Sequence, residues 1–457
     1  MFKKHLTVLS LAAALLAAVS CGESKLYPTP PGSHKPGNTS TPDTPQEQDQ
    51  EDELWKMPEK LFADDYFQKF TDPSGVVSYY LKSEAIGKDN SQSIYYIGTE
   101  MSNDERFVFA LCSTNEWSGE PQEKHGIVID LKTRKQYTFS GTTGAYPLLD
   151  PDEDKLYYVR RTTGNVYPYA YFYRRDLLVD PSAEIKLAPL PQGIMGRILP
   201  EGRYNPVWRI LNHITLTSDK KKVFIDPKVV DDFYWGLLDL YTGEWEEWGH
   251  STTENVTHGQ INPKHDDEAL CAIDSWTDQY KVDHKREEAA DGTCRRMQLV
   301  KKGYMKTIMP SDENGATHEG WTSDGNHVYF CGHGINVRNI RTGEYKRVLL
   351  TNLSKEQATH CHPSKDMTYW TFDDAYPDFY RGGRWKVRFL NTRTDKQAYI
   401  YTQRPAITSK DNQSSLHPDP HPHFVCNDKY IICTMAGEDL NLHLSITPVD
   451  QLIKMTE

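Results

Sequence analysis

Apolar and polar positions follow one another along this chain in a recurring order. A polar turn that contains Asp or Asn is followed by a short apolar strand, and the pair recurs seven times at intervals of roughly 40–65 residues. The seven apolar strands span residues 107–109, 156–159, 223–225, 269–271, 328–330, 369–370 and 430–433. A repeat of this length built from strands is typical of a propeller or another repeating β-architecture.

A second pattern lies between these copies and consists of two strands joined by a tight turn, often Thr-Gly. It occurs at residues 128–133, 237–244, 337–344 and 387–392. Each copy predicts a hairpin of period-2 strands. Two hairpins in each of seven repeats predict an all-β fold, a seven-bladed β-propeller with four-stranded blades over residues 54–457. Six or eight blades remain alternatives, and a pair of small β-sandwiches fits seven copies poorly.

The N-terminus differs from the rest of the chain. Lys3 and Lys4 precede an apolar run that ends in small residues directly before Cys21. This pattern predicts a signal peptide over residues 1–20 and resembles a bacterial lipoprotein signal, with Cys21 as the lipidated residue. An ordinary signal peptide with an incidental cysteine is the alternative. Residues 21–53 are rich in Pro, Ser, Thr, Gln, Glu and Asp, which predicts a disordered tether.

These features predict an exported outer-membrane lipoprotein that contacts the membrane through its lipid anchor only. The residues after Cys21 are not strongly acidic, which favours the periplasmic face over the cell surface. The net charge is −12, and there is no basic stripe, so nucleic acid is not an expected partner. The seven cysteines after Cys21 are odd in number and lack a Cys-x-x-Cys pair, which predicts small buried residues rather than a disulfide framework.

Histidine recurs at one position of the repeat, shortly before the polar turn. In a propeller, residues just before the innermost strands gather at one end of the central channel, so histidines from successive blades should meet there. In an extended His-x-His segment both imidazoles point to one face, and imidazole is a common ligand of transition metals. Histidines that only stabilise their own blades are the alternative. The recurring histidines are His213, His258, His318, His360 with His362, and His421 with His423.

Three segments carry a resemblance to a known family, the oligogalacturonate lyases of polysaccharide lyase family 22, over roughly residues 205–435. They are Thr257-His258-Gly259-Gln260-Ile261-Asn262-Pro263, His318-Glu319-Gly320-Trp321 and Gln357-x-x-His360-x-His362. The resemblance implies a seven-bladed propeller that binds a divalent metal. The implied ligands are His318, Gln357, His360 and His362, and the implied base is His258. Arg209 and Arg203 are the nearest candidates for an arginine that assists the base in the family.

The resemblance implies metal-assisted β-elimination at a 4-linked uronic acid in an acidic oligosaccharide. A divalent cation on the carboxylate stabilises the developing enolate, while a neutral histidine takes the proton from C5. Manganese is the first expectation for this ligand set, with Zn, Ni, Co or Ca as alternatives. Substrate contacts are expected from His213, His421, His423 and Trp321.

Three other functions stay open at this stage. A polar insertion at residues 281–296 predicts a substrate cleft of different shape from that of the family. A rhamnose–glucuronate linkage is therefore an alternative substrate. A non-catalytic TolB-like propeller that binds glycan or protein would need no metal. A glycoside hydrolase would need paired carboxylates, and Asp373, Asp374 and Glu319 form no compelling pair.

Overall fold

The computed structural model describes residues 58–113, 125–140, 146–161, 170–189, 191, 194, 207–278, 280–285, 295–308, 316–351, 358–373, 384–405, 419–439 and 441–457. The predicted signal peptide, the lipidated Cys21 and the tether lie outside these residues, as do Arg203, Gln357 and Asp374. Those predictions therefore stay predictions.

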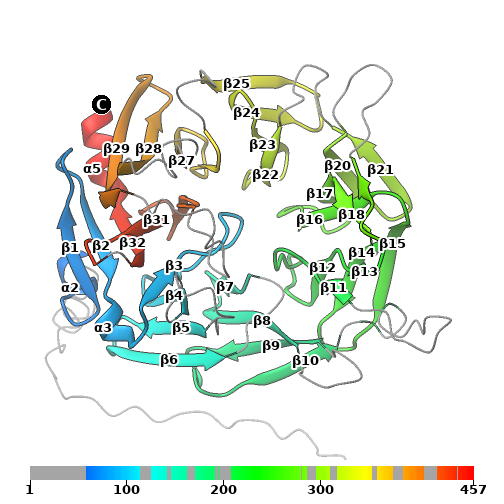
Figure 1. Ribbon diagram of the computed structural model, residues 1–457, viewed down its shortest axis with the longest axis horizontal. Coiled ribbons are helices and arrows are strands. Elements are labelled where there is room, and N and C mark those ends of the chain that lie inside the picture. Colours follow the sequence, from blue (N-terminus) through cyan, green and yellow to red (C-terminus); the bar gives the residue numbers. More distant parts are fainter. Residues whose placement is uncertain are drawn as a thin grey trace, which may run out of the picture. The chain divides into compact units, whose positions relative to one another are not determined.

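Seven sheets stand around a ring, as the repeat predicted (Figure 1). Six blades follow one another along the chain. Blades 1 to 3 are β3 (Asn90–Gln92), β4 (Phe107–Ser113), β5 (His125–Asp130) and β6 (Lys135–Ser140); β7 (Leu148–Asp150), β8 (Lys155–Arg161), β9 (Ala170–Asp176) and β10 (Ile185–Pro189); and β11 (Val207–Arg209), β12 (Lys222–Ile225), β13 (Lys228–Val229), β14 (Asp232–Asp239) and β15 (Trp245–Ser251). Blades 4 to 6 are β16 (Asn255–Ile261), β17 (Ala269–Asp274), β20 (Met297–Lys301) and β21 (Tyr304–Thr307); β22 (Thr317–Trp321), β23 (His327–Cys331), β24 (Gly334–Asn339) and β25 (Tyr345–Leu350); and β26 (Cys361–Pro363), β27 (Tyr369–Asp373), β28 (Arg384–Asn391) and β29 (Lys396–Pro405).

The seventh sheet, the closing blade, joins the two ends of the folded unit. It combines β1 (Phe67–Thr71) and β2 (Val77–Leu81) with β30 (His423–Val425), β31 (Tyr430–Ala436) and β32 (Leu442–Pro448). The junction is the antiparallel pairing of β2 with β32, at Tyr79 opposite Ile446 and Tyr80 opposite Ser445. Two short helices, α2 (Pro58–Leu61) and α3 (Ser83–Ile86), lie near the start, and α5 (Val449–Thr456) follows β32.

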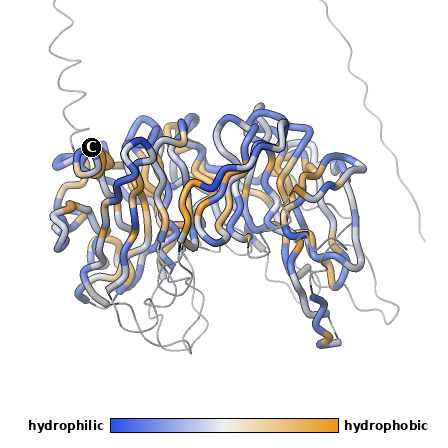
Figure 2. The backbone as a smooth tube through the Cα atoms, turned by 90° about the horizontal axis from the view of Figure 1, so that it is seen from above, coloured by the Kyte–Doolittle hydropathy of each residue, from blue (hydrophilic) through white to orange (hydrophobic). Residues whose placement is uncertain are grey.

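Five sheets have four strands, and two, blade 3 and the closing blade, have a fifth. All seven apolar strands of the repeat are confirmed, and β4 and β31 are buried at every position. Such strands lie between two neighbouring sheets and so bury both faces, which explains continuous apolar runs instead of alternation. Seen from its edge, the ring carries apolar stretches inside the blades and hydrophilic stretches in the turns (Figure 2).

The polar turn of the repeat has a physical basis in a Ser/Thr-x-Asp arrangement. In blade 5, Thr322 Oγ1 donates to Asp324 Oδ1 at 2.6 Å, and the N–H of Asn326 donates to the same oxygen at 2.9 Å. His327 Nδ1 lies 2.7 Å from Asp324 Oδ2. The corresponding hydroxyl–carboxylate pairs in other blades are Ser102 with Asp104, Thr217 with Asp219, and Ser364 with Asp366.

We expect Asp324→Ala to lower the free energy of unfolding by about 1 kcal/mol at pH 7, because charged hydrogen bonds at this half-exposed turn are lost. Partial burial raises the pKa of Asp324, but hydrogen bonds from Thr322, Asn326 and His327 lower it by more, to about 2. A carboxyl group with a lowered folded-state pKa stabilises the fold above its unfolded pKa, near 4, and loses this effect as the pH falls toward 2.

Denaturant unfolding at pH 7, 5, 4 and 3 should therefore show the two proteins converging below pH 4. Asp324→Asn is the control, since it keeps an acceptor oxygen but cannot titrate. A difference that stays constant down to pH 3 would contradict this account of the turn.

Three further features of the fold concern the cysteines, the polar insertion and the helices. The six cysteines of the described residues are all free and buried, as expected for small apolar residues. The polar insertion lies inside blade 4, between β17 and β20. Of its described residues, Asp283–His284 form β19, which pairs with β18 (Trp276–Thr277) just before the insertion. Among the helices of the described residues, none has the length and apolar character needed to cross a membrane.

Candidate active site and metal centre

Every blade contributes one ring-bearing side chain to a cluster at one end of the channel. Its members come from the segment before the polar turn of each repeat: three lie shortly before β7, β26 and β30, two lie within β16 and β22, and two follow β3 and β11. In chain order they are Tyr95, Tyr146, His213, His258, His318, His360 and His421. The structure thus brings together one histidine from each of the five blades that the sequence singled out.

Ring-to-ring distances trace the cluster around the channel. His213 lies 5.5 Å from His258 between ring centroids, and His318 lies 4.2 Å from His360. His360 lies 4.2 Å from His421. Tyr95 lies among these histidines, since its ring is 4.8 Å from His213, 4.9 Å from His421, 6.1 Å from His360 and 6.3 Å from His258.

Three of these histidines sit on unusual backbone. The φ angles of His258, His318 and His421 are 54°, 54° and 47°, in the left-handed region that non-glycine residues seldom adopt. The strand register shifts beside His258 and beside His318, as in a β-bulge. Bulges re-aim side chains next to functional sites. Glycine at position 259 lets the backbone next to His258 pass close to Phe224, because a Cβ atom there would lie 2.4 Å from the Phe224 side chain.

His258 occupies the side of the cluster suited to a base. Its Nδ1 lies 3.3 Å from His213 Nε2, and its Nε2 lies 3.7 Å from Asp274 Oδ2. Burial, followed by the charges of Arg296 and Arg209, lowers the pKa of His258 to about 3. The imidazole is therefore neutral at physiological pH and can accept a proton.

Arg296 is the cation next to this base. Its guanidinium forms an ion pair with Asp274 and donates to both carboxylate oxygens of Glu319, at 3.1 and 3.3 Å. The predicted assistant Arg209 instead donates to Asn255 Oδ1 at 3.0 Å and to the carbonyl of Val256 at 2.7 Å. Arg209 thus holds the strand that carries His258, and its predicted part in proton transfer stays a prediction.

The opposite side of the cluster can hold a metal. His360 Nδ1 lies 2.8 Å from a carboxylate oxygen of the fully buried Asp373, which also accepts the His360 N–H at 3.0 Å. Burial lowers the pKa of His360, but Asp373 and then Asp419 raise it by more. His318 Nδ1 donates to the carbonyl of Thr359. Each bond leaves Nε2 as the atom that can bind a metal, which is the usual arrangement of metal-binding histidines.

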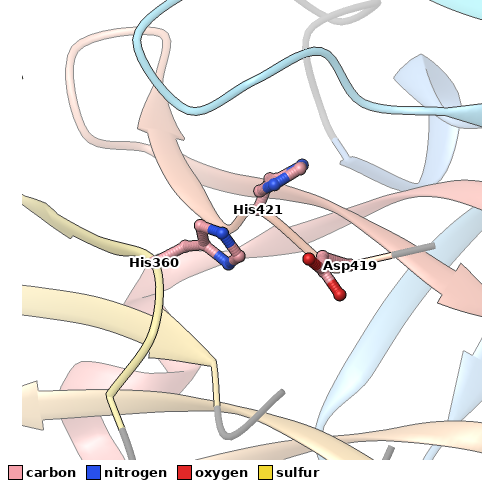
Figure 3. Close-up of side chains that lie close together, drawn as sticks. All are labelled: His360, Asp419 and His421. Atoms are coloured by element: carbon pink, nitrogen blue, oxygen red, sulfur yellow. The ribbon is translucent and has the colours of Figure 1, made fainter. Parts of the chain in front are cut away.

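His360, Asp419 and His421 form the only group of metal-type ligands found in the described part of the chain. One ligand atom from each lies within 4.8 Å of the others. Figure 3 shows the three side chains gathered around one point. Both histidines are 2% exposed, whereas Asp419 is half-buried. Two imidazole nitrogens with one carboxylate oxygen suit Mn, Zn, Ni or Co.

Three predicted site residues lie elsewhere. His362 and Trp321 line a cavity of about 390 Å³ at the other end of the innermost strands, beside turn residues such as Ser323. His362 Nδ1 accepts the N–H of Phe424 at 3.2 Å. The third predicted residue, His423, is fully buried.

His423 also has both ring nitrogens engaged. Nδ1 donates to the carbonyl of His421 at 2.9 Å, and Nε2 bonds Glu100. Both ring nitrogens of His423 thus have partners within the protein, and its predicted substrate contact stays a prediction. This histidine fits the blade-stabilising alternative.

Sequence reasoning missed five residues of the site: Tyr95, Tyr146, Arg296, Asp373 and Asp419. The two tyrosines stand where other blades carry histidine, but blades 1 and 2 offered no histidine as a signal. Asp419 lies in Pro418-Asp419-Pro420-His421, only two residues from a predicted contact. From the sequence, Asp373 is a candidate only for a hydrolase carboxylate.

Comparison with known proteins gives a match in structure only. No protein-family model matches the sequence, and no curated protein matches it. The fold is similar to that of an oligogalacturonate lyase solved in complex with manganese, with a TM-score of 0.60 and 16% identity over 84% of this chain and 96% of that chain. An oligogalacturonate lyase from Vibrio parahaemolyticus gives a TM-score of 0.57, with the same identity and coverage. At this identity the likeness concerns the fold, for which the expected resemblance is confirmed.

Proposed function

We propose that this propeller is a lyase that cleaves a 4-linked uronic acid by metal-assisted β-elimination. The observation that carries the proposal is the composition of one cluster. A neutral, strained histidine with hydrogen-bonding support stands on one side, and the group of His360, Asp419 and His421 stands on the other. A scaffold that only binds partners needs neither feature. The fold of the two similar lyases agrees with the proposal.

The hydrogen bond between His213 and His258 fixes which nitrogen of the base reacts. If His258 Nδ1–H donates to His213 Nε2, then His258 Nε2 keeps its lone pair. That nitrogen takes the proton from C5 of the uronide, and Asp274 at 3.7 Å stabilises the imidazolium that forms. His213 is therefore a positioning residue.

The remaining bond changes are those that a β-elimination to an unsaturated uronide requires. As the C5–H bond breaks, a C4–C5 double bond forms and the C4–O4 bond breaks. The leaving oxygen takes up a proton, for which we assign the half-buried Tyr95 hydroxyl, kept protonated because burial raises its pKa. A divalent metal held by His360, Asp419 and His421 would supply positive charge for the substrate carboxylate.

The test is incubation of the purified protein with oligogalacturonates and with oligomers that carry rhamnose–glucuronate linkages. An unsaturated uronide absorbs in the near ultraviolet, so its formation can be followed directly. Absorbance that appears with galacturonate oligomers alone supports the pectin substrate, and absorbance with the mixed oligomers alone supports the alternative linkage. A metal-loaded protein that gives no unsaturated product from either substrate would overturn the proposal.

His213→Ala is expected to lower kcat on the order of 10-fold with little change in KM, because the orientation of the base is lost. His213→Gln should recover part of the rate, since its amide oxygen can accept the His258 Nδ1–H. Steady-state kinetics of the two variants checks this. Equal losses in both would indicate that His213 has only a packing role.

We also retain the lipoprotein proposal, which rests on the sequence before the folded unit. A cysteine after a signal peptide acquires lipid and holds the protein at a membrane. In a bacterial host, Cys21→Ser should move the protein from the membrane fraction to the soluble fraction. Equal membrane association of the two proteins would exclude lipidation at Cys21 as the anchor.

A further inference from the structure

The closing blade supplies two of the three side chains in the metal-type group. Asp419 and His421 directly precede β30, whereas His360 directly precedes β26 of blade 6. The two inner strands lie side by side. The family resemblance implied a different set, with Gln357 and His362 from blade 6 and no residue from the closing blade.

The geometry around His362 argues against the implied set. His362 Nδ1 accepts the N–H of Phe424, and its ring lines the cavity at the opposite end of the innermost strands. Its ring lies 6.0 Å from the ring of the fully buried His423 between centroids. His360, two residues earlier, already lies among His318, Tyr95 and His421.

The segment that carries Asp419 and His421 is held in place by its own backbone. Pro420 stands between them, and proline fixes its φ angle. The carbonyl of Pro420 accepts the N–H of Thr434 at 2.8 Å and the hydroxyl of Ser93 at 3.3 Å. A ligand pair on such an anchored turn loses little conformational entropy when it binds.

The third ligand, His360, is oriented by hydrogen bonds to Asp373. Asp373 is fully buried and bonds both the backbone N–H and Nδ1 of His360. A carboxylate that accepts a hydrogen bond from Nδ1 of a histidine fixes the tautomer in which Nε2 is free to bind a metal, and it increases the basicity of Nε2. With two nitrogens and one oxygen from the protein, positions remain open for water and for a substrate carboxylate.

We propose that His360, Asp419 and His421 hold the divalent metal, and that the bound metal ties the closing blade to blade 6. The catalytic role of this metal rests on the proposed function, whereas the choice of its three ligands rests on the geometry of the side chains. Within the closing blade, the N-terminal strands β1 and β2 join the C-terminal strands through the pairing of β2 with β32. A metal that bridges blade 6 and the closing blade therefore reinforces the ring at the blade where its two ends meet.

The test measures metal binding and thermal unfolding of the full chain, without substrate. Isothermal titration with Mn²⁺ gives the Kd of the chelated protein and of Asp419→Asn and His421→Asn. Asn keeps the size of Asp419, and at His421 it tolerates the left-handed backbone. The matched controls are His362→Gln and Gln357→Ala, which alter only the implied set.

Asp419→Asn and His421→Asn should each weaken Mn²⁺ binding by about 10-fold or more. Both should also lose most of the rise in Tm that saturating Mn²⁺ gives the unmodified protein, because a ligand that binds only the folded state stabilises it. His362→Gln and Gln357→Ala should keep both properties. The opposite pattern, with binding lost in the two controls and retained in the Asp419 and His421 variants, would overturn the ligand set.

Hydrogen exchange of the unmodified protein with and without Mn²⁺ tests the link between the two blades. If Mn²⁺ protects the amides of β26 and β30 no more than those of the other blades, the link to ring closure would be overturned. Failure of the proposed function is a separate outcome. In that case the protein binds one metal at these residues and yields no unsaturated product from any uronide.

Discussion

Replacing His258 by alanine should lower kcat of uronide cleavage by about 10²–10⁴-fold, the range attributed to a general base. The reason lies in two features of the residue. Burial and the nearby arginines keep its imidazole neutral, and the bulge in β16 directs it into the cluster. Formation of the unsaturated product, followed by near-ultraviolet absorbance at saturating substrate, measures the loss.

Two controls separate this effect from damage to the fold. His258→Asn removes the base and keeps a residue that tolerates a positive φ angle, so it should be as inactive as the alanine variant while unfolding at a Tm near that of the unmodified protein. His265→Ala removes an exposed histidine outside the cluster and should leave the rate unchanged. If His258→Asn retained more than a tenth of the rate, His258 would not be the base.

Removal of divalent metal is expected to have the second large effect. Dialysis against a chelator should lower the rate at least 100-fold, because the charge on the substrate carboxylate is then no longer neutralised. Mn²⁺, Zn²⁺, Ni²⁺ or Co²⁺ should restore activity to different degrees. Ca²⁺ should restore less, since two of the three protein ligands are imidazole nitrogens and Ca²⁺ prefers oxygen.

The measurement is a rate assay on chelated protein titrated with each chloride salt, with bound metal counted by elemental analysis. Mg²⁺ serves as a matched control, because it prefers six oxygen ligands in an octahedron. Full activity in protein shown to contain no metal would rule out metal assistance and leave His258 to be tested alone.

The seven-bladed propeller was readable from the sequence because each blade repeats the same local rules. The Ser/Thr-x-Asp turn and the apolar strand after it depend on neighbours within about ten residues, so periodicity is sufficient to find them. The shared position of His213, His258, His318, His360 and His421 came from the same periodicity. Equivalent positions in a propeller meet around one axis whatever their separation in sequence.

The sequence by itself determined the all-β repeat and the end of the channel where histidines gather, and it favoured seven blades, which the structure confirms. Only the tertiary structure decided which of two nearby histidines enters the cluster, as for His360 against His362 and His421 against His423. A His-x-His spacing predicts one shared face for an ideal strand, whereas His360 precedes β26 and His421 has a positive φ angle. The partners Asp373, Asp419 and Arg296 belong to contacts between segments far apart in the chain or to irregular turns, which no local pattern encodes.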